Sequence, residues 1–214
     1  YHKVVFEMQG ITDKILARIR GHSRGQWVCT SKDFLDLGSR DAVDQALSRL
    51  VKQNTLRRIG RGLYDYPRIS QILQRPAPAN VDAVIAAVAR RDNITILPDG
   101  IVAAHNLGLT NAVPARHSYL TDGSSRTMKV GNRSLKLRHA SARLMAWHNR
   151  PGAPVIRALY WLGKNIADDQ NVVTTLQKRL SPDIKADLVD GIKLLPAWMI
   201  PVVRQVSSKE SVLS

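Results

Sequence analysis

The hydrophobic pattern of the chain changes its period once, sharply, within residues 39–66. Apolar residues up to about Gln53 recur at intervals of three and four, which is typical of one face of a helix. From Thr55 to Tyr66 apolar and polar residues alternate as in a strand, and Gly60-Arg61-Gly62 interrupts the alternation with a turn. The pattern predicts an amphipathic helix that leads directly into a β-hairpin, and both need a further layer to cover their apolar faces.

The residues ahead of this helix supply that layer. Residues 11–22 have helical periodicity, residues 27–29 are predicted to be extended, and residues 31–37 form a second predicted helix that Ser31 can cap. Helix, short strand, helix, tight turn, helix and hairpin is the order of a winged helix-turn-helix. We therefore predict such a DNA-binding domain over residues 8–75. Met8 is a candidate for the natural start of the protein.

The chain is strongly basic. Its 214 residues include 32 Lys and Arg against 17 Asp and Glu, a formal net charge of +15. An excess of this size favours a polyanionic partner, and nucleic acid is the most common one. No apolar run approaches the length of a membrane span, and the single cysteine, Cys29, excludes an internal disulfide and multi-cysteine zinc motifs. We expect a soluble, cytoplasmic protein with no membrane partner.

The predicted helix 39–53 is the candidate for a DNA major groove, which accepts one helix. Its apolar stripe can seat it on the two preceding helices, and its opposite side is then free to meet base edges. The candidate recognition residues are Ser39, Arg40, Asp44, Gln45, Ser48 and Arg49. The candidate wing residues, which would reach phosphates or a minor groove, are Arg57, Arg58, Arg61 and Gly62. The alternative is a small helical bundle with a solvated, arginine-rich turn and no DNA.

A stiff linker is predicted for residues 74–80, which contain Pro76 and Pro78. Beyond it, strands are predicted at 94–97, 118–121, 126–130 and 134–139, and helices at 81–91, 99–107, 153–164, 168–180, 182–194 and 196–206. The predicted fold class is therefore α+β. A winged helix-turn-helix is followed by a mixed domain, residues 81–206, with a small sheet and a helical C-terminal half.

A second run of basic residues lies in the predicted hairpin 126–139. It consists of Arg126, Lys129, Arg133, Lys136 and Arg138. Alternation places Lys136 and Arg138 on one face of a strand and Leu135 and Leu137 on the other. The basic face is a candidate for a second phosphate contact, and the alternative is a solvated sheet edge protected by its cations.

The sequence offers no recognisable catalytic or metal-binding pattern. Its six histidines are scattered, and it has no nucleophile elbow, P-loop or zinc-protease motif. Asp183-Ile184-Lys185 resembles the end of a metal-nuclease motif, but Ser181-Pro182-Asp183 is also a typical helix start, with a cap, a proline and an acid in the first turn. We expect no enzyme activity, no cofactor and no metal.

Several runs of the sequence resemble a known family. They are residues 33–40 (DFLDLGSR), 42–50 (AVDQALSRL), 59–67 (IGRGLYDYP), 119–123 (YLTDG) and 195–199 (LPAWM). These runs are similar to the AbiEi-type antitoxins, in the branch that carries a domain of unknown function, and the likeness extends from Met8 to about Val206. The resemblance implies a winged helix that binds repeats in its own promoter. It also implies a C-terminal antitoxin domain that counters a co-encoded nucleotidyltransferase toxin, without a stable complex between the two.

The leading hypothesis is thus a repressor of its own operon that binds double-stranded DNA, with a dimer on the DNA as a further candidate arrangement. Residues 8–75 alone are expected to bind the operator, though more weakly than the whole chain. Two alternatives stay open. A direct toxin-sequestering protein would co-purify with its toxin, and a basic nucleic-acid-processing enzyme subunit would cleave DNA in the presence of magnesium.

Overall fold

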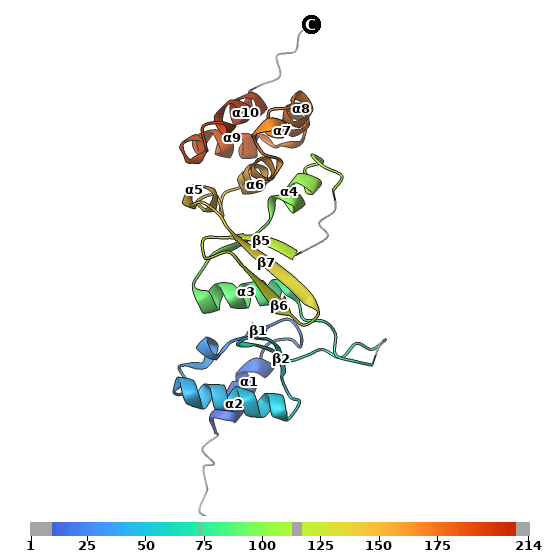
Figure 1. Ribbon diagram of the computed structural model, residues 1–214, viewed down its shortest axis with the longest axis vertical. Coiled ribbons are helices and arrows are strands. Elements are labelled where there is room, and N and C mark those ends of the chain that lie inside the picture. Colours follow the sequence, from blue (N-terminus) through green and yellow to red (C-terminus); the bar gives the residue numbers. More distant parts are fainter. Residues whose placement is uncertain (1–9, 73, 113–116, 209–214) are drawn as a thin grey trace, which may run out of the picture. The chain divides into compact units, whose positions relative to one another are not determined.

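The computed structural model describes residues 10–72, 74–112 and 117–208, and their fold is α+β (Figure 1). Met8, the candidate start, lies outside the described residues. Two compact units divide the chain: the first contains the described residues up to Ile94 together with Met128–Ser134, and the second contains Thr95–Thr127 and the residues from Leu135 onward. Within the described ranges, every helix is too short or too polar to cross a bilayer.

The first unit follows the predicted order of elements closely. Its helices and strands are α1 (Ile11–Arg20), β1 (Val28–Cys29), the 3-10 turn η1 (Ser31–Phe34), α2 (Arg40–Lys52), β2 (Arg57–Gly60), β3 (Leu63–Asp65) and α3 (Val81–Asp92). The three strands form an antiparallel sheet in the order β1-β3-β2. Val28 pairs with Asp65, and Arg58 pairs with Tyr64. The hairpin predicted around Gly60-Arg61-Gly62 is therefore confirmed, with a bulge between Arg58 and Gly60.

The apolar stripe of α2 forms the centre of the core of this unit. Val43, Ala46, Leu47 and Leu50 are buried, and they share one cluster with residues of α1, β1 and η1. The Ser39 hydroxyl accepts a hydrogen bond from the Ala42 amide at 3.3 Å, so the predicted cap of this helix is confirmed.

The predicted helix at 31–37 differs from the structure. It is a single 3-10 turn capped by Thr30, and the Asp33 carboxylate accepts hydrogen bonds from both the amide and the hydroxyl of Thr30. Ser31, the predicted cap, instead donates its hydroxyl to Asp44 of α2. Two neighbouring residues could each cap a helix here. The Asp33 carboxylate favours Thr30 as the cap, and the contact with α2 engages Ser31 instead.

The predicted linker is also different, because it folds back on the first unit. Ile69 forms an isolated antiparallel bridge with Pro76, and the Ala77 amide donates to the Arg68 carbonyl at 2.8 Å. Arg57 of β2 donates to the Ala77 carbonyl at 2.9 Å. We call residues 67–72 and 74–80 the strap. Because the strap is bonded to strand β2, it does not act as a free spacer.

Helix α3 belongs to the first unit, whereas the predicted domain 81–206 placed it in the second. Its Arg90 donates to the Val28 carbonyl at 3.0 Å and pairs with Asp33, and its Arg91 donates to the Arg61 carbonyl at 2.8 Å. The boundary between the compact units follows Ile94, not the proline-rich segment.

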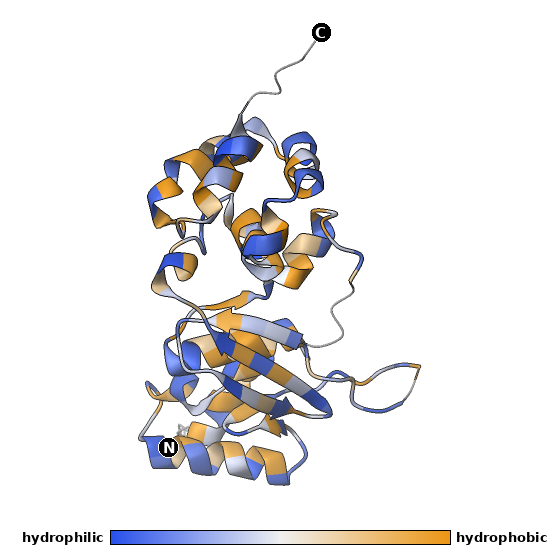
Figure 2. Cartoon of the chain, turned by 45° about the horizontal axis from the view of Figure 1, so that its top comes forward, coloured by the Kyte–Doolittle hydropathy of each residue, from blue (hydrophilic) through white to orange (hydrophobic). Residues whose placement is uncertain are grey.

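The second unit combines a small sheet with a helical half, as predicted. Its first helices and strands are β4 (Ile96–Pro98), α4 (Gly100–Asn106), β5 (His117–Thr121), β6 (Arg126–Val130) and β7 (Arg133–His139). The strand order is β4-β5-β7-β6, with β5 and β7 parallel. Residues 128–134 of the β6–β7 hairpin are counted with the first unit. Along β7, hydrophobic and hydrophilic residues alternate (Figure 2), and Leu135 and Leu137 are buried as predicted.

The helical half contains α5 (Ala142–Met145), α6 (Ala153–Leu162), α7 (Lys164–Ala167), α8 (Gln170–Arg179), α9 (Pro182–Asp190), the turn η2 (Ile192–Leu194) and α10 (Met199–Ser207). Its core is aliphatic apart from Trp147, which is 1% exposed. Gly100 lets α4 approach α6, because a Cβ at this position would overlap the Arg157 carbonyl oxygen and lie 2.7 Å from the Trp161 Cβ. The sequence pattern alone does not reveal this close contact.

Candidate nucleic-acid interface

Helix α2 turns one face to the core and the other to solvent. Its buried stripe seats the helix, so most residues between the stripe positions are exposed and Ala42 and Asp44 are half-buried. The predicted recognition residues that are exposed are Ser39, Arg40, Gln45, Ser48 and Arg49. They extend over about three turns of helix, and a DNA major groove accepts one helix.

Asp44 is the exception among the predicted recognition residues. Its carboxylate accepts hydrogen bonds from the Ser31 hydroxyl and from the Arg40 Nε at 2.9 Å. Burial raises the pKa of Asp44, but the hydrogen bonds from Ser31 and Arg40 outweigh it, so the pKa is lowered overall. Asp44 therefore ties α2 to η1, and its oxygens are already engaged on the protein.

Arg57 also has a different environment from the one predicted for the wing. Its Nε and Nη2 contact the two oxygens of Asp65 at 3.0 and 2.6 Å, and the Asp65 side chain is 2% exposed. Such a two-pronged pair fixes the guanidinium in one plane. Since its Nη1 also binds the strap, Arg57 holds β2, β3 and the strap together rather than reaching outward.

Two arginines of the predicted wing are exposed at the hairpin, Arg58 in strand β2 and Arg61 in its turn. Arg58 contacts the Gly60 carbonyl at 3.4 Å through its Nε, and the Arg61 side chain is exposed. Gly62 has a φ of +64°, a conformation that glycine adopts without strain. Arg91 of α3 supports the turn through the Arg61 carbonyl. The sequence analysis did not connect Arg91 with the turn, because 30 residues separate them.

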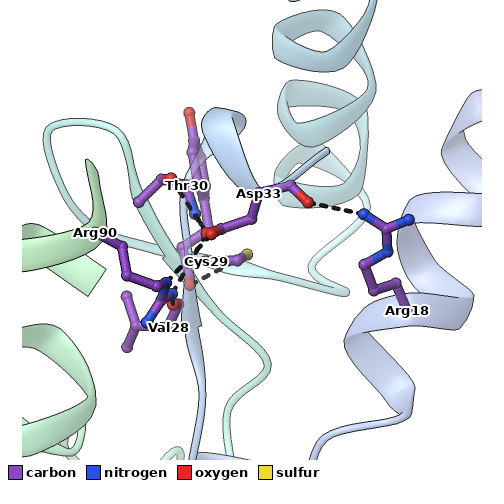
Figure 3. A network of polar contacts seen from close by, with 7 residues as sticks. Arg18, Val28, Cys29, Thr30, Asp33 and Arg90 are labelled. Carbon is purple, nitrogen blue, oxygen red and sulfur yellow. Dashed lines mark hydrogen bonds and ion pairs between the residues drawn. The ribbon is translucent and has the colours of Figure 1, made fainter. Parts of the chain in front are cut away.

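A polar network fixes η1 between its neighbouring helices (Figure 3). The Asp33 carboxylate accepts a hydrogen bond from the Thr30 amide and forms an ion pair with Arg90. The Asp33 carbonyl accepts a hydrogen bond from Arg18 at 2.8 Å. Arg18 also pairs with Asp36 at 2.6 Å, which raises the pKa of Arg18 and lowers the pKa of Asp36. Burial raises the pKa of the Cys29 thiol, so this cysteine behaves as a small core residue.

The second predicted basic surface divides between the two compact units. Lys129 and Arg133 belong to the first unit, and Arg126, Lys136 and Arg138 belong to the second. Arg138 contacts both oxygens of Asp99 at 2.9 Å, and Asp99 is 6% exposed and caps α4. Arg138 is therefore engaged within its own unit, whereas Lys129, Arg133 and Lys136 are exposed.

Both units are covered by one family model. Residues 14–185 match the model described as "Family of unknown function (DUF6088)". The chain belongs to this family. No curated protein matches the chain with significance. The description of DUF6088 contains no activity, so a function for this member rests on its residues.

The residues that suggested a metal nuclease, Asp183-Ile184-Lys185, lie at the start of a helix in this DUF6088 chain. Asp183 lies in the first turn of α9, where the Ser181 hydroxyl accepts the Ile184 amide at 3.4 Å, so the helix-start interpretation is confirmed. Across the described ranges, no three His, Cys, Asp or Glu side chains gather as metal ligands would. A hollow of about 140 Å³ in the second unit is lined mainly by apolar and aromatic side chains, among them Trp147, Tyr160 and Trp198.

Proposed function

We propose that the first unit is a winged helix-turn-helix that binds double-stranded DNA, and that the protein represses its own operon. One observation carries the proposal. Helix α2 follows a short helical turn, is seated by a continuous buried stripe and leads into the β2–β3 hairpin, and strand β1 pairs with β3. This arrangement leaves Gln45, Ser48 and Arg49 exposed on one helix and Arg61 at the hairpin turn.

The charge of the protein supports the same partner. A net charge of +15 attracts a polyanion over long range and makes binding depend on salt. The exposed arginines supply phosphate contacts, and the polar side chains of α2 supply contacts to base edges. A repressor acts where the DNA is, so we expect it in the cytoplasm.

The role as an antitoxin is the second part of the proposal, and the resemblance to AbiEi-type antitoxins supports it. On this proposal, the second unit counters a co-encoded nucleotidyltransferase toxin without forming a stable complex. Co-expression tests it: the chain restores growth to cells that produce the toxin, and a tagged toxin does not retain the chain during purification. Equimolar retention would favour direct sequestration instead.

A gel shift tests the DNA-binding part. The full chain is titrated against the DNA directly upstream of its own gene and against a shuffled duplex of equal length and composition. We expect binding at least about 10³-fold tighter on the native duplex, in the usual range of specific recognition. Equal affinity for both duplexes would contradict a specific repressor, and cleavage of either duplex with magnesium would favour the enzyme alternative.

A further inference from the structure

A basic hollow of about 220 Å³ lies at one end of the three-stranded sheet of the first unit. Strands β1 and β2 begin at this end and β3 ends there, so the hollow is at the opposite end of the sheet from the Gly60–Gly62 turn. Its lining includes Arg24, Arg57 and Arg68 together with the strap. The proposed DNA contacts at the hairpin turn therefore do not account for it.

Positive charge dominates the lining. Among the described residues, the carboxylate that pairs with the lining is that of Asp65, which is 2% exposed and bonded to Arg57. Arg24 and Arg68 have no carboxylate partner within the described ranges. Two arginine side chains thus line one hollow, an arrangement that favours an anion there.

Arg24 is exposed and contacts the side chain of Tyr66. Its guanidinium carbon lies 4.4 Å from the centre of the Tyr66 ring, and its Nη2 donates to the Tyr66 hydroxyl. Stacking on an aromatic face leaves the remaining N–H groups of the guanidinium free to donate in its plane. An arginine restrained by such a contact loses less side-chain entropy when it binds an oxyanion.

The backbone around the hollow permits the close approach of Arg68. Gly25 has a φ of +74°, and a Cβ there would lie 3.2 Å from the Arg68 Cβ. The Gly25 amide donates to the Tyr66 carbonyl at 2.8 Å, which joins the start of β1 to the end of β3. A side chain at position 25 would be strained and would press on Arg68, so glycine is needed for this geometry.

Neutral donors complete the lining. The Asn80 side-chain amide donates to Gln26 at 3.0 Å, and the Asn80 oxygen caps the twelve-residue helix α3. The first turn of α3 carries the acid Asp82, so the positive charge of the hollow comes from its arginines. The hollow thus combines guanidinium and amide groups.

We propose that this hollow is a binding site for a phosphate-sized oxyanion, held by Arg24 and Arg68 with Arg57 at its edge. The paired N–H groups of a guanidinium match the oxygen spacing of phosphate. Hydrogen bonds between two charged groups are stronger than those between neutral groups. The phosphate comes from a free small molecule or from a DNA backbone, since both present the same oxygens. The site does not depend on the proposed repressor function, because a free phosphate binds whether or not the protein recognises an operator.

Titration calorimetry on the full chain tests the site, with inorganic phosphate and pyrophosphate at constant ionic strength. The variants are Arg24→Gln, Arg68→Gln and the double variant. The matched control is Arg75→Gln, because Arg75 is exposed on the same strap but does not line the hollow. Arg57 is left unchanged because it holds Asp65. Circular dichroism confirms that each variant unfolds at the temperature of the parent chain.

If the ligand is a free phosphate, we expect saturable binding of one anion. Each lining variant should weaken its affinity about tenfold or more, and Arg75→Gln should weaken it less than about twofold. If the ligand is a phosphate of a DNA backbone, we expect no saturable binding of the free anions. In that case the double variant lowers the slope of log affinity against log salt for a random duplex by about 1 to 2, and Arg75→Gln leaves it unchanged. The proposal is overturned if the double variant changes neither measurement, or changes them no more than Arg75→Gln does.

Discussion

At the scale of single residues, the arginines of the β2–β3 hairpin separate into a structural one and exposed ones. Arg57→Ala should lower the free energy of unfolding by about 3 kcal/mol, because it leaves the buried Asp65 carboxylate without its partner. Arg61→Ala should change that free energy by no more than about 0.5 kcal/mol, since its side chain is exposed. Urea denaturation of the two variants measures both values.

Variants at the same two positions also test the proposed interface. Arg61→Ala should lower the slope of log DNA affinity against log salt by about one. Arg57→Lys keeps the charge but loses the two-pronged contact, and it should be less stable than the parent chain while its salt slope is unchanged. If Arg57→Ala unfolds like the parent and lowers the slope instead, Arg57 contacts DNA and its pair with Asp65 is unimportant.

Asp44 should make stability depend on pH in the acid range. Its pKa is lowered in the folded state, so its contribution is fully present above the ordinary value of about 3.9 and is lost as the pH falls through the folded value. Between pH 5 and pH 3, Asp44→Asn should lose less stability than the parent chain. Ser31→Ala keeps the carboxylate but removes a donor, so its Asp44 pKa, measured by NMR titration, should be higher than in the parent. An unchanged Asp44 pKa in Ser31→Ala would show that the Ser31 hydrogen bond does not lower the pKa of Asp44.

At the scale of elements, the contact between α4 and α6 depends on a residue without a side chain. Gly100→Ala should destabilise the protein by about 3 kcal/mol, because the new methyl group overlaps the Arg157 carbonyl oxygen and the two helices must separate. Val102→Ala, at a 39% exposed position of the same helix, should cost less than about 1 kcal/mol. Equal midpoints in urea denaturation for the two variants would show that α4 can move without cost.

Elements with a local signal were predictable from the sequence. Helix α2 has both a periodic stripe and a serine cap, and the β2–β3 hairpin has alternation around a glycine turn, so their positions agree with the prediction. The η1 turn was missed in detail because Thr30 and Ser31 are both good caps. The capping box between Thr30 and Asp33 and the contact between Ser31 and Asp44 distinguish them. Local patterns carry no information on which distant side chain a charged residue meets.

The candidate interface shows the same limit. The exposed positions of α2 follow from its periodicity, but the engagement of Arg57 by Asp65 and of Arg138 by Asp99 does not, because these are contacts between separate elements. The strap is the clearest case. Its prolines predict an extended segment that acts as a spacer. The hydrogen bonds of Ala77 with Arg68 and Arg57 instead make it part of the first unit.

At the scale of the whole molecule, the position of α3 changes what an isolated fragment for the proposed DNA binding must contain. Residues 10–75 lack the Arg90 contacts with Val28 and Asp33 and the support that Arg91 provides to the hairpin turn. Residues 10–94 keep all of them, and both fragments lack 128–134, so the comparison isolates the strap end and α3.

We expect the fragment 10–94 to unfold cooperatively and to be at least about 2 kcal/mol more stable than 10–75, because several hydrogen bonds to charged groups are lost together in the shorter one. On random duplex DNA it should also bind more tightly, since the turn that presents Arg61 is held in one position. Thermal unfolding followed by circular dichroism gives the first comparison and a gel shift gives the second. Arg91→Ala in 10–94 isolates the support of the turn: it should lower DNA affinity toward that of 10–75 while retaining most of the added stability. Equal stability and equal affinity for 10–75 and 10–94 would instead place the boundary of the DNA-binding domain near residue 75, as the sequence pattern predicts, and would make α3 dispensable for the first unit.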